Sequence, residues 1–382
     1  MTSSSAGSFI RPLRRGCGLP AALLVAIGCA EPEPIHLGLA GPFADPVGAP
    51  MQRAARLAVE HINAAGGING RPLVLIEMDD HGDPDSAIAV ATALLASPAV
   101  AVIGHLWSTT TIAAAPIYGS TAVALPMVTP SSSSPEVSWL GEHVFRVCPS
   151  DDAHGTALAD WARQALSAQR AGILYLNDDY GRGVRQAFAS RFVVRGGTVV
   201  GSFPYLDAGR DAAAYLDRLA LEDSLDAILL AGYPEDAAEV LGQTRSRGIT
   251  VPVLGGDALE GVESTGSLAE GVLVSAAWFP DGRSAAAREF LDSYAAAFPD
   301  TPVPNQPAAA TWDAVHLLAA VLRTTNATRG TMGAALATVG TGRRVHEGVT
   351  GPIGFDERGD LAQSRITITV VRDGQLVRAE QP

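Results

Sequence analysis

Four consecutive hydroxyl side chains follow an apolar segment in the stretch VIGHLWSTTT, residues 102–111. Hydroxyls at the end of a strand can cap a helix, assist a nucleophile or bind a small ligand. Ser108 begins the helix-like run STTTIAAAPIYG, and the first turn of a helix offers free N–H groups and a positive dipole end. A serine there adds a hydroxyl donor, so Ser108 is a candidate for binding a carboxylate.

Two further strand-like segments also end in polar residues. SSSS at 131–134 supplies hydroxyls and carbonyls, and the carboxylate of Asp257 can pair with an ammonium group. Taken singly, Ser108 and Ser133 are ordinary helix caps and Asp257 is an ordinary turn residue. Together they favour the binding of a small zwitterion, if the fold brings these strand ends to face one another from two lobes, as predicted below.

The sequence lacks motifs for catalysis or metal binding. It has no Gly-x-Ser-x-Gly elbow, and GLAGPF after the first predicted strand lacks the spacing of a dinucleotide-binding loop. DDHGDPD at 79–85 does not fit a calcium loop and instead predicts a helix cap at Asp83. We expect His105 to hold its loop by hydrogen bonding. These patterns predict a binding protein with no enzymatic activity, no cofactor and no metal.

Composition narrows the functional classes further. The 382-residue chain has a formal net charge of −13 and contains no lysine, so all 27 fixed cations are arginines. A Walker-type phosphate lysine and a Schiff-base lysine are therefore excluded, and nucleic acid is a disfavoured partner. The length predicts more than one lobe. Cys148 follows an apolar strand, which is typical of a small core residue.

The N-terminus has the pattern of an export signal. A basic segment precedes the short apolar run GLPAALLVAI at 18–27, whose last two residues begin the segment AIGC at 26–29. AIGC resembles a bacterial lipobox, in which Cys29 becomes the lipidated first residue; an ordinary signal peptide is the alternative. We predict a signal segment over 1–29, a tether over 30–34, and an exported protein anchored through Cys29, in the periplasm or on the outer face of a membrane.

From Ile35 onward, strand-like and helix-like segments alternate. IHLGLAG at 35–41 is typical of a buried strand, and MQRAARLAVEHINAA at 51–65 places its apolar residues on one helical face. The alternation occurs twice, around 35–147 and 148–275. It predicts an α/β fold with two doubly wound parallel-sheet lobes, whose ligand site lies at the carboxyl ends of the strands.

An ordered set of segments closely resembles the leucine/isoleucine/valine-binding proteins of bacterial ABC transporters. The set comprises INAAGGINGRPLVLIEMDDHGDPDSAIAVATALL, VIGHLWSTTT, YGRG, AGYPED, VLGGD, AEGVLVS, WDAV and GPIGFDERGDL. The resemblance implies a type I periplasmic binding protein, with two lobes joined by three hinge crossovers around a ligand cleft. It implies a first lobe of 35–148 plus 278–362 and a second lobe of 149–277 plus 363–382.

The resemblance also implies a set of binding residues. Ser108 takes the place of the serine that binds the ligand α-carboxylate, and Asp257 that of the acidic residue that takes the ammonium. By position, a carbonyl and a hydroxyl of the next loop fall on Ser132 and Ser133. The other pocket residues implied are Tyr180, Tyr233, Leu106, Trp107 and Trp312.

Some residues depart from the family pattern. The best-known members have a disulfide between the positions of His81 and Trp107, and both cysteines are absent here. Trp107 instead puts a large indole beside Ser108, and Asp257 is one methylene shorter than the usual glutamate. The ammonium must then sit closer to Asp257 or be bridged by water.

The resemblance implies a monomeric solute-binding protein that delivers a branched-chain amino acid, or a similar small amino acid or amide, to an ABC permease in the membrane. Urea and amide binders share this fold. A sensory binding protein that acts through a separate membrane receptor is the alternative.

Overall fold

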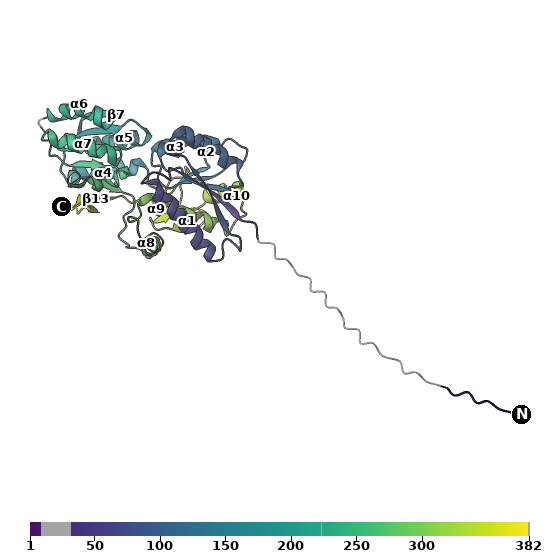
Figure 1. Cartoon of the computed structure of the whole chain (residues 1–382). Coiled ribbons are helices and arrows are strands. Elements are labelled where there is room, and N and C mark those ends of the chain that lie inside the picture. The colour runs from purple at the N-terminus through teal and green to yellow at the C-terminus, as the bar shows by residue number, and fades with distance from the viewer. Residues whose placement is uncertain (9–31, 223, 381–382) are drawn as a thin grey trace. The chain divides into compact units, whose positions relative to one another are not determined.

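Two β-sheets organise the chain (Figure 1). The computed structural model describes residues 1–8, 32–222 and 224–380, so the predicted lipidation site Cys29 lies outside the described residues. All of the helices and strands below lie between Glu33 and Pro382, which form one compact unit. None of the described helices is long and apolar enough to cross a membrane.

The first sheet is parallel throughout, with strand order β2-β1-β3-β4-β5. Its strands are β1 (Ile35–Gly41), β2 (Leu73–Asp79), β3 (Ala101–Ile103), β4 (Met127–Thr129) and β5 (Val144–Arg146). Its helices are α1 (Gly48–Ala64), α2 (Pro84–Ala96) and α3 (Ser108–Tyr118), joined by α8 (Ala285–Ala297), α9 (Gln306–Leu322) and α10 (Arg329–Leu336).

Alternating side chains divide the core of this sheet into two layers. Leu37 and Leu39 of β1 pack with α1 and α9, whereas Ala40 and Val102 pack with α2 and α3 on the other face. As the sequence predicts, α2 begins at a capping Asp83, whose side chain accepts a hydrogen bond from the Ser86 N–H at 2.8 Å.

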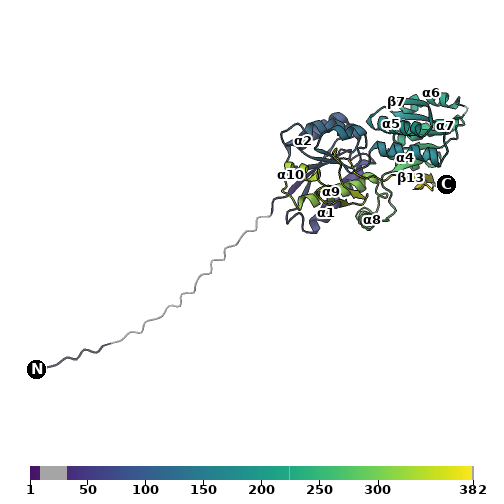
Figure 2. The same cartoon turned by 180° about the vertical axis from the view of Figure 1, so that it is seen from behind.

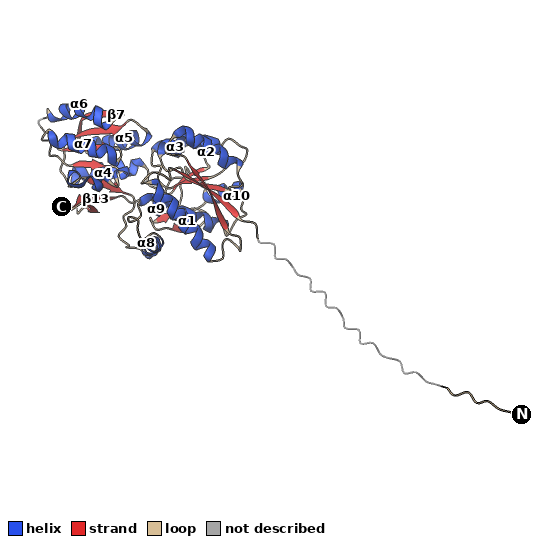
Figure 3. Cartoon of the chain, in the orientation of Figure 1, coloured by secondary structure: helices blue, strands red, loops and turns tan. Residues whose placement is uncertain are grey.

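The second sheet has strand order β14-β13-β10-β9-β8-β6-β7. Its strands are β6 (Arg170–Leu176), β7 (Thr198–Tyr205), β8 (Ala227–Ala231), β9 (Val253–Gly255), β10 (Leu273–Ala276), β13 (Thr367–Arg372) and β14 (Gln375–Arg378). Its helices are α4 (Asp151–Gln164), α5 (Asp179–Val194), α6 (Ala208–Ala220) and α7 (Pro234–Ser246). Figure 3 shows helices flanking the strands.

This sheet is not wholly parallel. β13 runs antiparallel to β10, and β14 pairs antiparallel with β13, so the predicted parallel sheet ends in an antiparallel edge. The two-residue turn Asp373–Gly374 between them allows only an antiparallel return, since a parallel one needs a long crossover. ITITVVRDG lies in the second sheet, with most of its residues in β13.

Helix α9 brings a distant part of the chain back to the first sheet. It packs against α1 and against β3 and β4, and α1 and α9 lie side by side in both Figure 1 and Figure 2. The exact lobe boundaries stay a prediction, with which these contacts agree. Short elements that the sequence reading did not anticipate are the strand pair β11 (His346–Glu347) and β12 (Pro352–Ile353) and the 3-10 helices η1 (Pro135–Trp139), η2 (Asp257–Leu259) and η3 (Val262–Leu268).

Asp313 fastens α9 to the segment before β12, and its removal tests this junction. Its buried carboxylate accepts hydrogen bonds from the Val349 and Thr350 N–H groups at 2.7 and 2.8 Å. Asp313→Ala leaves both groups without a partner, so we expect unfolding in urea to show a loss of about 2–4 kcal/mol. Asp292→Ala, at an exposed position of α8, is the control. Equal stability of both variants would contradict this account.

Candidate functional site

A cavity of about 690 Å³ is lined by residues that follow strands of both sheets. Trp107 and Ser108 come after β3, and Ser131 and Ser133 come after β4. From the other sheet, the lining residues after β6, β8 and β9 are Tyr180, Tyr233 and Asp257. The carboxyl ends of parallel strands are where open α/β sheets bind ligands. The cavity is thus the candidate site.

Ser108 is the first residue of α3, and only 4% of it is exposed. Trp107 occupies the N-cap in extended conformation and makes no side-chain capping bond, so Ser108 is not the cap. The Ser108 hydroxyl accepts a hydrogen bond from the Ser134 N–H at 3.1 Å, which leaves its own O–H free to donate. Together with the N–H groups of the first helical turn, this hydroxyl forms a site for a carboxylate.

The serine loop brings Ser131 and Ser133 to the cavity, and Ser133 is one of the two residues that the resemblance implies. For Ser132 the resemblance implies a contact through its carbonyl, which stays a prediction. Ser132 is fully buried, with its Oγ 2.5 Å from Thr111 Oγ1 and 3.2 Å from the Leu106 carbonyl oxygen. Its hydroxyl therefore fastens the loop to the start of α3. Ser131 was missed because alternation alone does not fix which serine faces the ligand.

Arg146 holds this loop from behind. Its guanidinium is buried and donates to the carbonyl oxygens of Ser133 and Ser134 at 3.0 and 2.9 Å. On its other side it pairs with Asp360 at 2.7 Å, and Asp360 also accepts a hydrogen bond from Ser138. A buried charge with this many partners fixes the course of the backbone at Ser133.

His105 joins the segments beneath the site, as the sequence predicts. Its Nδ1 lies 2.6 Å from Asp80 Oδ2 and its Nε2 lies 3.1 Å from the Tyr118 hydroxyl, with His105 and Asp80 fully buried. The His105 carbonyl accepts a hydrogen bond from Thr129 Oγ1 at 2.8 Å. The described residues contain no cluster of three or more side chains suited to a metal.

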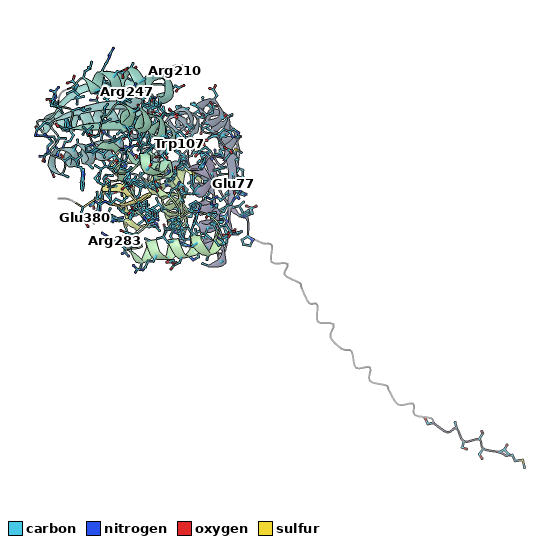
Figure 4. The ribbon with its side chains drawn as sticks, turned by 60° about the vertical axis from the view of Figure 1, so that its left-hand side comes forward. Glu77, Trp107, Arg210, Arg247, Arg283 and Glu380 are labelled. Atoms are coloured by element: carbon cyan, nitrogen blue, oxygen red, sulfur yellow. The ribbon has the colours of Figure 1, made fainter. Side chains whose placement is uncertain are left out.

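Three aromatic rings form one wall of the cavity. The Trp107 and Tyr233 rings meet edge to face with centroids 5.3 Å apart, and Tyr233 lies 5.6 Å from Tyr180. Trp107 thus contacts a residue of the other lobe, and Figure 4 shows it where the elements of the two sheets meet. Its indole also packs near Gly82, where an added Cβ would lie 3.2 Å from Nε1. Packing of the Trp107 indole therefore links the segments around Gly82 and Trp107.

Asp257 faces the cavity in front of two buried polar residues that the sequence reading missed. Its Oδ2 lies 3.5 Å from His154 Nε2, while its Oδ1 and both carboxylate oxygens of buried Asp151 have no hydrogen-bond partner among the described residues. Burial and the nearby Asp257 raise the pKa of Asp151, and burial lowers the pKa of His154. A neutral histidine leaves this site negative and suited to an ammonium.

Two predicted pocket residues lie elsewhere. Leu106 is fully buried in the core with α1 and α9, and Trp312 is 6% exposed and stacks on His61 with centroids 5.6 Å apart. Neither is among the residues that line the cavity, so their place near the ligand side chain stays a prediction. Trp312 lies well inside α9, whereas Gln306 at the first turn of that helix reaches the cavity. Cys148 is a buried free thiol whose pKa burial raises, in keeping with a core residue.

Four other charged residues line the cavity: Arg53, Glu235, Glu260 and Glu263. None follows a strand directly, so the strand-end rule could not find them. Glu260 accepts a hydrogen bond from the Gln306 N–H at 3.3 Å, across from the start of α9. Burial raises the pKa of Glu260 from its ordinary value of 4.5 to about 8.

The raised pKa of Glu260 predicts a pH-dependent stability. The folded protein holds this proton more tightly than the unfolded chain, so the contribution of Glu260 to stability falls as the pH rises from 4.5 through about 8. Glu260→Gln stays neutral and removes this loss. We expect its melting temperature, relative to the parent protein, to be higher at about pH 9 than at about pH 5. Exposed Glu239→Gln should show no such trend, and a flat difference for Glu260→Gln would contradict the burial argument.

Comparison with known proteins agrees with this architecture. A family model described as "Periplasmic binding protein" matches residues 35–375. An "Amino acid binding protein" of Pseudomonas aeruginosa is 31% identical over 61% of this chain and 60% of its own length. A leucine-, isoleucine-, valine-, threonine- and alanine-binding protein of the same organism is 29% identical over 88% of this chain and 89% of its own.

A solved structure extends the likeness to the whole fold. The ABC transporter substrate-binding protein of Desulfitobacterium hafniense, in complex with Leu, is 30% identical with a TM-score of 0.80 and covers 91% of this chain and 100% of that one. The first of the relatives above is matched over less than two thirds of its length, but the family model spans both sheets. The chain belongs to the periplasmic binding protein family and has the type I fold of that family.

Proposed function

We propose that this protein is the extracytoplasmic solute-binding component of an ABC importer and that it binds an α-amino acid in the cavity. The observation that carries this proposal is the opposition of two complementary sites. Ser108 at the first turn of α3 offers donors for a carboxylate, and Asp257, in front of buried Asp151, offers a carboxylate to an ammonium. A zwitterion satisfies both at once.

The ligand carboxylate would lie at the start of α3, where the Ser108 hydroxyl and the Ser133 side chain line the cavity. The ammonium would lie against Asp257, whose Oδ1 has no partner among the described residues. Tyr180, Tyr233 and Trp107 enclose the space between and exclude water. Each charged end of the ligand then replaces its water shell by fixed partners.

Delivery follows from the two-lobed form. Ligand contacts on both lobes favour the closed arrangement, which a membrane permease would accept from a monomeric binding protein. The side chains of the cavity bind and orient, and we assign them no catalytic step. The names of the relatives support an amino acid as the ligand, and two of those names state branched-chain amino acids or leucine.

Removal of the paired sites tests the proposal. In calorimetric titrations against a panel of L-amino acids, Ser108→Ala should weaken binding of the best ligand about 10- to 100-fold, the cost of a hydrogen bond to a charged group. Asp257→Asn should weaken it further, because the ammonium loses its counter-charge. Ser246→Ala, on the exposed part of α7, is the matched control. Unchanged affinity in both variants would refute the site, and a panel without any binder would refute the function.

We also propose that Cys29 carries a lipid that holds the exported protein at a membrane. The supporting observation is AIGC at the end of a short apolar segment. When the full chain is expressed in a bacterium with lipoprotein processing, it should sediment with membranes, and Cys29→Ala should move it to the soluble exported fraction. An unchanged distribution would contradict lipidation.

A further inference from the structure

A second chamber adjoins the main cavity on the side of β10 and residues 277–280. It has a volume of about 410 Å³ and shares Asp257, Glu260, Glu263, Val303 and Gln306 with the main cavity. The two spaces therefore meet at these five residues. A long ligand bound at Ser108 and Asp257 would enter the second chamber beside Glu260.

The second chamber is acidic on the side that it shares with the main cavity, and the rest of its wall is mainly apolar and aromatic. Every charged residue that lines it in the described structure is a carboxylate, namely Asp257, Glu260 or Glu263. Trp278 and Phe279 contribute aromatic surface to its wall. In the main cavity the lining cation is Arg53, whose Nε donates to the Tyr294 hydroxyl at 2.8 Å, on the α1 side.

Buried polar groups behind Asp257 supply no cation to it. Asp151 is fully buried with neither carboxylate oxygen bonded among the described residues, and His154, also fully buried, directs an unbonded Nε2 toward Asp257. One ligand ammonium at Asp257 pairs with that carboxylate and leaves Glu260 and Glu263 without a cationic partner. A second positive group beside them would favour the ionised form of Glu260, so the cleft as a whole suits a ligand with more than one positive centre.

We infer that the ligand is longer than a branched-chain amino acid and carries a second cationic group, an ammonium or guanidinium, which lies in the second chamber beside Glu260 and Glu263. Trp278 lines the same chamber and could add cation–π attraction to the charge pairing, whereas the ring of Phe279 already packs against Arg378, whose Cζ lies 5.4 Å from the ring centroid. A purely aliphatic side chain would leave both glutamates without a cationic partner. This inference rests on the proposed function, because it assumes that the α-carboxylate and α-ammonium are held at Ser108 and Asp257.

Calorimetric titration with four probes tests it: L-lysine, L-arginine, L-norleucine and L-glutamate. Norleucine has the straight side chain of lysine without its terminal ammonium. The parent protein should bind lysine or arginine at least about ten-fold more tightly than norleucine. Glu260→Gln and Glu263→Gln should each lose about ten-fold for the basic probe and remain within about three-fold for norleucine. Glu239→Gln, an exposed charge change in the same lobe, is the control.

The outcomes separate this inference from the proposed function. If norleucine binds as tightly as the basic probes, the inference fails while the amino-acid site stands. If glutamate binds most tightly, the far end of the ligand is anionic and pairs with Arg53, which also overturns the inference. If none of these probes nor any other amino acid binds, the proposed function fails as well. Glutamine has nearly the same shape as glutamate, so both variants should fold. Their melting curves check that a loss of binding is not caused by a loss of folding.

Discussion

An acidic group that faces the cavity with no cation in contact is the constraint on which the site depends. Burial and the nearby Asp257 raise the pKa of Asp151, and burial lowers the pKa of His154, so neither residue offers Asp257 a positive charge. Arg146, the buried cation nearby, is already engaged with Asp360 and the serine loop. Asp257 therefore faces the cavity without an arginine partner among the described residues, and a bound ammonium would supply the counter-charge.

The fold holds the polar groups of the site in place on rigid elements. Strand ends present the polar groups, and buried hydrogen bonds behind them fix each one: His105 under the β3 loop, Arg146 behind the serines, and Ala258 N–H to the Tyr180 hydroxyl at 3.1 Å. Glycine makes room where these groups crowd. A Cβ on Gly256 would lie 2.2 Å from the Tyr180 hydroxyl oxygen, and one on Gly183 would lie 2.2 Å from Asp151 Oδ2.

Much of this arrangement could be predicted from sequence because hydrophobic alternation and strand ends are local signals. Ser108 and Asp257 were found that way. Position along the chain does not tell which way a side chain points, however: Leu106 is buried in the core, and the Ser132 hydroxyl lies against Thr111. Asp151 and Glu260 were missed because their importance comes from burial and from neighbours far away in sequence. The antiparallel pairing of β14 with β13 follows from a two-residue turn, which the alternation of strands and helices does not predict.

The return of α9 to the first sheet has a consequence for how the chain acquires its structure. The core between β1 and α1 stays open until residues 306–322 are present to cover it, although β1 is made first. Contacts between segments as far apart as β1 and α9 form late and slowly, because the long stretch of chain between them must first be ordered. The first sheet can therefore complete its core only late in synthesis, whereas most of the core of the second sheet comes from residues 158–274.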